Sequence, residues 1–266
     1  MLKRLKKTGN NVATKKQKVI SMLVNVGSFQ QKLDRVVSLA TSKTGSYVCV
    51  SNVHMCMEVF DSSMFADVVN SADLVVADGR PIFWAKQLLG RKDTEQVRGQ
   101  DLMNALCAMP SSDIKIGLYG GFNQSVLDKV KARIIEDNPS AEVVYAYSPP
   151  FRPLTAEEDA EVCQQINDSG VNVLFVGIGC PKQEFWMADH KEKLSCVMLG
   201  VGAAFDFIAG SKKHAPKWMQ RVGLEWLFRL LSEPKRLWKR YLKQNPRFIY
   251  HFSKQLIKHK LGKSNV

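Results

Sequence analysis

Several signatures of common protein classes are missing from this chain of 266 residues. Its six cysteines form no C-x-x-C pair, and several lie inside apolar runs, which is typical of reduced, buried thiols in a reducing compartment. No segment approaches the roughly 20 apolar residues that span a bilayer, and the N-terminus lacks the apolar stretch of a signal peptide. We therefore expect a cytoplasmic protein.

Motifs for metal, hydrolase and dinucleotide chemistry are also missing. The five histidines show no H-x-x-x-H or Cys/His spacing, so no metal is expected, and no G-x-S-x-G turn offers a hydrolase nucleophile. The glycine-rich segments do not match G-x-G-x-x-G, because Phe205, for example, occupies the third glycine position of one of them. A nicotinamide-linked oxidoreductase is thus disfavoured, and it stays the alternative function.

The net charge of +13 is concentrated at the two ends of the chain. Residues 1–20 carry seven Lys/Arg and no acid, residues 212–266 carry fifteen against two acids, and residues 21–211 carry sixteen bases and twenty-three acids. Nucleic-acid enzymes line their clefts with positive charge, so an acidic body argues against nucleic acid as a partner. Basic ends on an acidic body fit an anionic membrane surface. A non-enzymatic adaptor would share this pattern but would leave the polar strand ends without a purpose.

Apolar runs alternate with helical patterns between about residues 46 and 205, which predicts an α/β fold with a mainly parallel sheet and helices on both faces. The strand-like runs cover 46–50, 73–77, 114–119, 142–146, 171–179 and 196–202. The helical patterns cover 29–43, 99–109, 124–137 and 155–169. Beyond residue 210 we predict three helices divided at Pro234 and Pro246. The expected parts are a basic tail (1–20), an α/β catalytic core (21–210) and a basic amphipathic helical appendage (211–266).

Three of the predicted strand ends are rich in glycine, at 117–123, 176–184 and 199–210. Glycine lets backbone N–H groups approach a phosphate, and a following helix N-terminus adds a favourable dipole, so a nucleotide diphosphate is the expected ligand. A tight turn without a ligand, or a solvated first turn whose acid serves the helix dipole, is the alternative. The candidate binding residues here are Gly120, Gly121, Gly179, Lys182, Gln183 and Glu184.

Polar side chains follow two other predicted strands. Asp78 ends the run "DLVVAD" and Asn52 follows "SYVCVS". Ligands of open α/β sheets bind at the carboxyl ends of the strands, so the two residues together predict a polar pocket. An Asx turn or a helix cap is the alternative for each.

The appendage combines basic, aromatic and apolar residues at helical spacing. Its basic residues on one face are Arg236, Lys239, Arg240 and Lys243, with Trp238 and Tyr241 nearby. This pattern is typical of an interfacial helix or of a clamp on a diphosphate, and a helical bundle packed on the core is the alternative.

The strings "NVHM", "ADLVVADG", "GQDLM", "YGG", "GCPKQEFWM", "GVGAAFDFIAG" and "APKWMQRVGLEWLFRLLSEPKRLWKRYL" occur in the order seen in the WecG/TagA/CpsF glycosyltransferases. The chain resembles this family over roughly residues 20–250. The resemblance implies an inverting transferase of exopolysaccharide, teichoic acid or surface antigen synthesis. Such an enzyme moves a sugar from a UDP-sugar to a sugar on a polyprenyl-diphosphate carrier, with no metal or other cofactor.

The resemblance also implies a fold and a location. The expected fold is a Rossmann-like α/β core with a C-terminal helical appendage that closes the active site. The appendage is expected to meet the inner face of the bacterial membrane, so the enzyme would be cytoplasmic and peripherally associated. A homo-oligomer is compatible with the sequence.

Matched motifs carry the family's site residues onto this chain. They imply Asp78 as general base, with Asn52 and Gln183 at sugar-contacting positions and Gly79 beside the base. They also place three arginines near the diphosphate, namely Arg229, Arg236 and Arg240.

Two positions depart from the family pattern. Val50 stands where a threonine is common, which leaves Ser51 as the nearest hydroxyl, and Gln96 stands where many members have arginine. Residues i and i+2 of extended backbone share a face, so Arg98 is a candidate substitute for that arginine.

Overall fold

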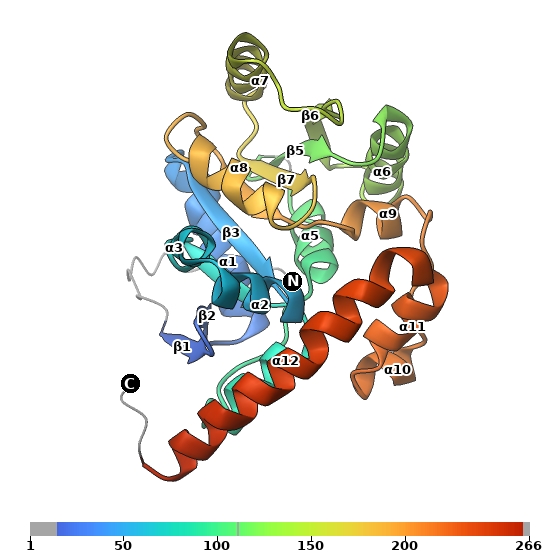
Figure 1. The fold of residues 1–266 in the computed structure, drawn as a ribbon. Helices are drawn as coiled ribbons and strands as arrows, with labels where there is room; N and C mark the ends of the chain where they lie inside the picture. The colour runs from blue at the N-terminus through green and yellow to red at the C-terminus, as the bar shows by residue number, and fades with distance from the viewer. Residues whose placement is uncertain (1–14, 111, 263–266) are drawn as a thin grey trace, which may run out of the picture.

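The central sheet has six strands, all parallel, in the order β4-β3-β8-β7-β5-β6. The computed structural model describes residues 15–110 and 112–262. The strands are β3 (Ser46–Ser51), β4 (Leu74–Ala77), β5 (Lys115–Gly120), β6 (Glu142–Tyr147), β7 (Val173–Gly177) and β8 (Val197–Gly200). Each falls on an apolar run of the sequence, because strands covered on both faces need side chains of that kind throughout. The predicted α/β class with a parallel sheet is confirmed (Figure 1).

Helices cover both faces of the sheet and bury two separate apolar clusters. One cluster contains residues of α1 (Phe29–Ser42), α5 (Gly99–Cys107), α6 (Gln124–Asp137) and α9 (Ala204–Ile208). The other contains residues of α2 (Val53–Asp61), α3 (Ser63–Asn70), α4 (Arg80–Leu88), α7 (Ala156–Asp168) and α8 (Lys182–His190). This arrangement of helices on both faces was predicted from the alternation of patterns.

A β-hairpin that we did not predict precedes the core. It consists of β1 (Lys16–Val19) and β2 (Met22–Asn25), which pair antiparallel. The side chain of Asn25 at the end of β2 accepts from the backbone N of Val75 in β4 at 2.7 Å. Residues 16–19 of the predicted basic tail thus belong to this hairpin, while residues 1–14 lie outside the described residues.

Beyond the sheet lie α10 (Lys217–Arg221), α11 (Glu225–Ser232) and α12 (Pro234–Lys260). The break predicted at Pro246 is wrong, because α12 runs through this proline without ending. A proline inside a helix costs about 3 kcal/mol, so other contacts must hold the two halves in line. Gln244 donates a hydrogen bond to Glu58 of α2, and Arg247 pairs with Asp61 of the same helix. Phe248 is buried in the apolar cluster that contains α2.

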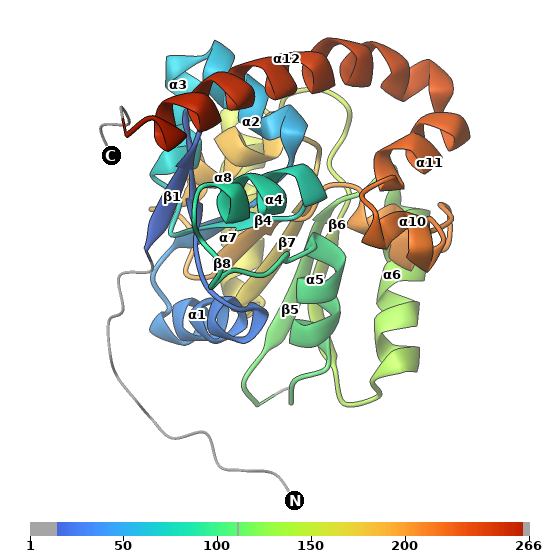
Figure 2. The same cartoon turned by 90° about the horizontal axis from the view of Figure 1, so that it is seen from below.

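Helix α12, the last helix of the appendage, lies along α2 and extends back across the core (Figure 2). Among the described residues, none of the helices combines the length and the apolar character that crossing a bilayer takes.

Candidate active site

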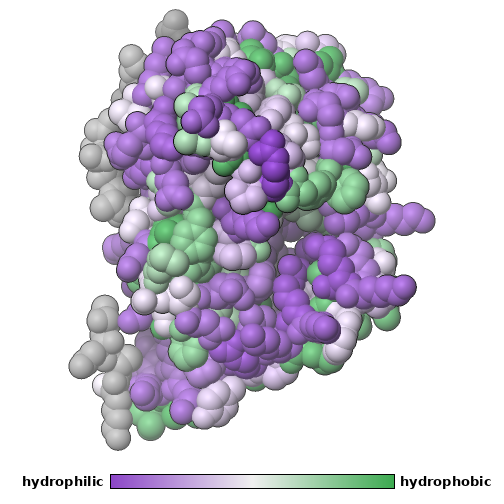
Figure 3. All heavy atoms as spheres, turned by 45° about the horizontal axis from the view of Figure 1, so that its top comes forward, coloured by the Kyte–Doolittle hydropathy of each residue, from purple (hydrophilic) through white to green (hydrophobic). Residues whose placement is uncertain are grey.

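A cleft of about 1240 Å³ lies at the carboxyl ends of the strands, where the chain turns from strand to helix or loop. Residues that follow each of the six strands line it, namely Asn52, Asp78, Gly121, Pro149, Gly179 and Gly202. The appendage contributes Glu225, Arg229, Glu233, Arg236 and Arg240 on the opposite side. Figure 3 shows that the molecule is hollowed on this face and that hydrophobic residues interrupt its hydrophilic surface. The strand ends and the appendage therefore share one site.

Asp78 lies in this cleft, where the strand β4 ends. Its Oδ1 accepts from the backbone N of Gly99 at 2.9 Å, and within the described residues no hydrogen bond reaches Oδ2. The pKa of this carboxyl is raised to about 6, mainly by burial and also by Glu225, although the Gly99 N–H, Arg229 and Arg98 act to lower it. The side chain is thus an anion at pH 7 with one oxygen available to take a proton.

The backbone around Asp78 is held by residues from two other segments. Its N–H donates to the Ser51 carbonyl of β3 at 2.9 Å, and its own carbonyl accepts from Gln96 Nε2. Gly79 forms the N-cap of α4, and a Cβ built on it would lie 3.4 Å from Asn52 Cβ. Asp78 therefore sits in a turn that leaves its neighbours little room to move.

Asn52 lines the cleft and also caps a helix. Its Oδ1 accepts from the N of Met55 at 3.2 Å, so the capping alternative holds for that atom, and the amide nitrogen stays available as a donor. Ser51 does not reach the cleft. Its hydroxyl is fully buried and donates to the Val76 carbonyl at 2.7 Å, because successive side chains of a strand point to opposite faces. The expected substrate contact of Ser51 is not supported.

Arg98, rather than Gln96, faces the cleft. The Arg98 guanidinium donates to both oxygens of Asp101, at 2.7 and 2.9 Å, and to the side chain of Gln220 in the appendage. Gln96 instead supports the Asp78 carbonyl. Arg98 therefore brings a cation to this part of the cleft, with its charge partly balanced by Asp101.

The glycine-rich strand ends divide into two groups. Gly121 and Gly179 line the cleft, and both have positive φ, +81° and +89°. Gly120 does not line it, and a Cβ there would lie 2.6 Å from the carbonyl carbon of Gly177. Close strand packing, not ligand contact, requires glycine at 120. The expectation that Gly120 binds a ligand is therefore not supported.

The first turn of α8 places three adjacent candidates differently. Lys182 and Gln183 line the cleft, whereas Glu184 is fully buried behind them. Gln183 Nε2 donates to Glu184 Oε1 at 2.7 Å. Glu184 thus supports a cleft residue and is not itself placed to contact a ligand there.

The three appendage arginines that the resemblance singled out all line the cleft. Arg229 lies over the Phe207 ring, with its guanidinium carbon 5.6 Å from the ring centre, and Arg240 lies over Tyr241 at 5.3 Å. The Nε atoms of both are buried and have no hydrogen-bond partner among the described residues. Arg236 pairs with Glu233 at 2.6 Å. Two of these cations therefore have donor capacity left for an anionic ligand.

The sequence reasoning missed several cleft residues. Glu225 and Glu233, the two acids of the basic appendage, both line the cleft, and their isolation among cations could have marked them. Trp186 stacks on Tyr119 with ring centroids 4.3 Å apart. His54, in contrast, follows Asn52 by two residues and could be expected from the sequence to line the same pocket, which it does. Burial and the nearby Arg240 lower its pKa to about 4, so it is neutral at pH 7.

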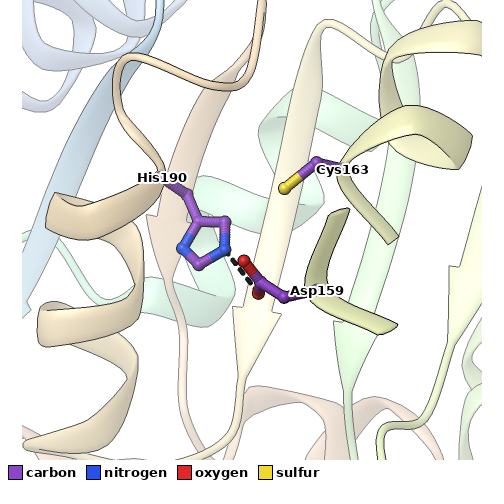
Figure 4. A group of neighbouring side chains, drawn as sticks. All are labelled: Asp159, Cys163 and His190. Atoms are coloured by element: carbon purple, nitrogen blue, oxygen red, sulfur yellow. Dashed lines mark hydrogen bonds and ion pairs between the residues drawn. The ribbon is translucent and has the colours of Figure 1, made fainter. Parts of the chain in front are cut away.

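One group of potential metal ligands lies near the stacked Trp186. The ligand atoms of Asp159, Cys163 and His190 lie within 4.8 Å of one another (Figure 4). His190 already bonds Asp159 at 2.8 Å and the Trp186 carbonyl at 2.7 Å, and the Lys193 ammonium lies 3.0 Å from the other Asp159 oxygen. Burial raises the pKa of the Cys163 thiol. A neutral thiol, an occupied imidazole and an adjacent cation do not suit a metal ion.

Comparisons with known proteins agree with the motifs. A family model described as the glycosyl transferase WecG/TagA/CpsF family matches residues 17–262. A protein of Bacillus spizizenii (strain ATCC 23059 / NRRL B-14472 / W23) is named N-acetylglucosaminyldiphosphoundecaprenol N-acetyl-beta-D-mannosaminyltransferase. It is 28% identical over 199 residues, which cover 74% of this chain and 75% of the relative. The chain therefore belongs to the WecG/TagA/CpsF family and is a glycosyltransferase.

Proposed function

We propose that this enzyme transfers a sugar, with inversion, from a UDP-sugar to a sugar carried on a polyprenyl diphosphate, and that Asp78 is the general base. The observation that carries the proposal is the Asp78 carboxylate at the cleft, with Oδ2 free and a pKa raised to about 6. A base whose pKa lies just below the working pH is ionised and still takes up a proton readily.

The cleft has the features that a nucleotide diphosphate requires. Backbone at Gly121, Gly179 and Gly202 lines it without side chains, which lets main-chain N–H groups approach phosphate oxygens. Lys182 and the appendage arginines supply positive charge on the same cleft. The named activity of the Bacillus relative supports an N-acetylhexosamine as the donor sugar and a lipid-diphosphate-linked N-acetylglucosamine as the acceptor.

The reaction follows from these positions as a direct displacement. Asp78 removes the proton from the acceptor hydroxyl while that oxygen attacks the anomeric carbon and UDP leaves from the opposite side. Arg229 and Arg240 stabilise the charge that develops on the departing diphosphate. Because UDP carries that charge well, orientation in an enclosed site supplies much of the rate, up to ~7–11 kcal/mol in favourable cases.

The outer face of α12 supports membrane association of this enzyme. Beside the buried Phe248 and Phe252, the helix exposes Leu242 by 66% and Ile249 by 64%, and Trp238, Ile257 and Leu261 are exposed along the helix and at its end. Lysines at 243, 254 and 258 flank these side chains. An exposed apolar stripe with flanking cations fits an anionic bilayer surface, which would bring the cleft to a lipid-bound acceptor.

A donor screen tests the proposal. Purified enzyme is incubated with a short-chain lipid-diphosphate-linked N-acetylglucosamine and, in turn, UDP-N-acetylmannosamine, UDP-N-acetylglucosamine and UDP-glucose, and the lipid product is weighed by mass spectrometry. We expect a product one sugar heavier with one of the donors, and binding of UDP but not NADH by calorimetry. Binding of NADH without transfer from any UDP-sugar would instead favour the oxidoreductase alternative.

A further inference from the structure

Glu184 is a buried carboxylate with an unusual environment. The residue is 0% exposed, and it forms no ion pair with a cation within the described residues. Its Oε2 has no hydrogen-bond partner there. The pKa of this carboxyl is raised to about 7 by burial, although hydrogen bonds from Gln183, from its own backbone N–H and from the Cys180 thiol act to lower it. Burying a carboxylate without a cation beside it lowers stability, so an acid at this position points to a role for the hydrogen bond that its other oxygen makes.

The other oxygen, Oε1, holds the side-chain amide of Gln183. Gln183 Nε2 donates to it at 2.7 Å, while the backbone N of Gly179 donates to Gln183 Oε1 at 3.3 Å. In its ionised form the Glu184 carboxyl only accepts, and a backbone N–H only donates. The two contacts therefore allow one rotation of the amide, with the nitrogen toward Glu184 and the oxygen toward Gly179.

This rotation decides what the cleft offers to a ligand. Gln183 and Gly202 both line the cleft, and a Cβ built on Gly202 would lie 3.8 Å from Gln183 Oε1. A carbonyl oxygen has two lone pairs, and the Gly179 N–H uses one of them. The remaining lone pair leaves Oε1 able to accept a hydrogen bond from a ligand beside Gly202, whereas the opposite rotation would place the amide nitrogen there.

We propose that Glu184 is a positioning residue, which locks the Gln183 amide so that its Oε1 accepts a hydrogen bond from a hydroxyl or amide N–H of the donor sugar. This inference rests on the proposed function, because it assumes that a sugar nucleotide occupies the cleft. Glu184 acts only through Gln183 and does not touch the substrate. Where Gln183 Oε1 meets the ligand, the orientation set by Glu184 favours a sugar group that donates a hydrogen bond over one that accepts.

A double-mutant cycle tests the proposal, with the UDP-sugar that the wild type accepts as donor. Glu184→Met keeps the volume and removes the acceptor, and Glu184→Gln restores an acceptor without the charge. We expect kcat/KM to fall about 10- to 100-fold in Glu184→Met and in Gln183→Leu, and to stay within about threefold in Glu184→Gln. In the double variant we expect no further loss beyond Gln183→Leu alone. Losses that multiply in the double variant would overturn the proposal, as would full activity in Glu184→Met.

Two further measurements separate positioning from stability and from the proposed function. UDP without a sugar should bind Glu184→Met as tightly as it binds the wild type. A misfolded variant would bind neither UDP nor the UDP-sugar. The side-chain amide NMR signal of Gln183, identified by its loss in Gln183→Leu, should shift and exchange faster with solvent in Glu184→Met. An unchanged signal would overturn the positioning role whatever the enzyme transfers. Wild-type protein that accepts no UDP-sugar would refute the proposed function alone, since the NMR test needs no turnover.

Discussion

Replacing Asp78 with asparagine removes the proposed base with little change in shape. The Gly99 N–H lies 2.9 Å from Asp78 Oδ1, and the oxygen of an asparagine can accept it equally well. The amide nitrogen would then occupy the position of the free Oδ2. A donor with no basicity thus replaces a carboxylate at the point where the acceptor hydroxyl must lose its proton. Because burial raises the pKa of Asp78 in the folded protein, its charge lowers stability at pH 7, so we expect the Tm of Asp78→Asn to equal or exceed the wild-type value.

The size of the kinetic effect follows from the role of the residue. A general base contributes about 10²- to 10⁴-fold, so kcat of Asp78→Asn should fall by that factor, which corresponds to roughly 3–5 kcal/mol of transition-state stabilisation. With a pKa of about 6, the base is mostly ionised at pH 7 and mostly protonated at pH 5. Wild-type kcat/KM should therefore decline about tenfold between these values. UDP release measured from pH 5 to 8 gives both quantities.

The control for this experiment is Asp128→Asn, which removes an exposed carboxylate on α6 outside the cleft. This variant should keep the wild-type rate and pH profile, and all three proteins should bind UDP alike. A rate for Asp78→Asn near that of the wild type would refute the assignment of the base. If kcat/KM of Asp78→Asn still declined between pH 7 and pH 5, another group would be responsible for that decline.

Three further changes test other parts of the molecule. Lys86→Met removes a buried amine whose pKa is lowered to about 7. Above pH 7 the unfolded wild-type chain binds more protons at this residue than the folded one, so its free energy of unfolding should rise with pH by up to about 1.4 kcal/mol per unit more than that of the variant. Urea denaturation of both proteins at several pH values measures this difference. In Arg229→Met, calorimetry should find UDP bound roughly 10- to 100-fold more weakly, and an unchanged Kd would remove this arginine from the diphosphate site. Ile249→Glu should abolish flotation with anionic vesicles while transfer to a water-soluble short-chain acceptor continues, and undiminished flotation would exclude this face of α12.

The strands were predictable because each falls on an apolar run of the sequence, as expected where both faces of the sheet are covered. The β1–β2 hairpin was not, since only four residues form each strand and lysines at 16 and 18 gave the segment the composition of a tail. The continuity of α12 through Pro246 was also not predictable. It depends on contacts to Glu58 and Asp61, which lie far away in the sequence.

The site was predictable where one strand end determines a residue's place, as for Asp78 and Asn52. Ser51 failed because the sequence shows that it ends a strand but not which face its hydroxyl takes. Glu184 and Gln183 are adjacent in the first turn of α8, yet only the packed structure shows that one is buried behind the other. The cleft position of Glu225 depends on how the appendage folds back, which no local pattern specifies.

The anomeric configuration of the transferred sugar tests the central claim most directly. In the proposed mechanism one attacking hydroxyl, activated by the Asp78 carboxylate, displaces UDP in a single step, so a donor whose sugar is α-linked to UDP must give a β-linked product. Proton NMR of the lipid-linked disaccharide formed by the wild-type enzyme measures this. A β-linkage agrees with direct displacement assisted by Asp78, and an α-linkage would contradict it.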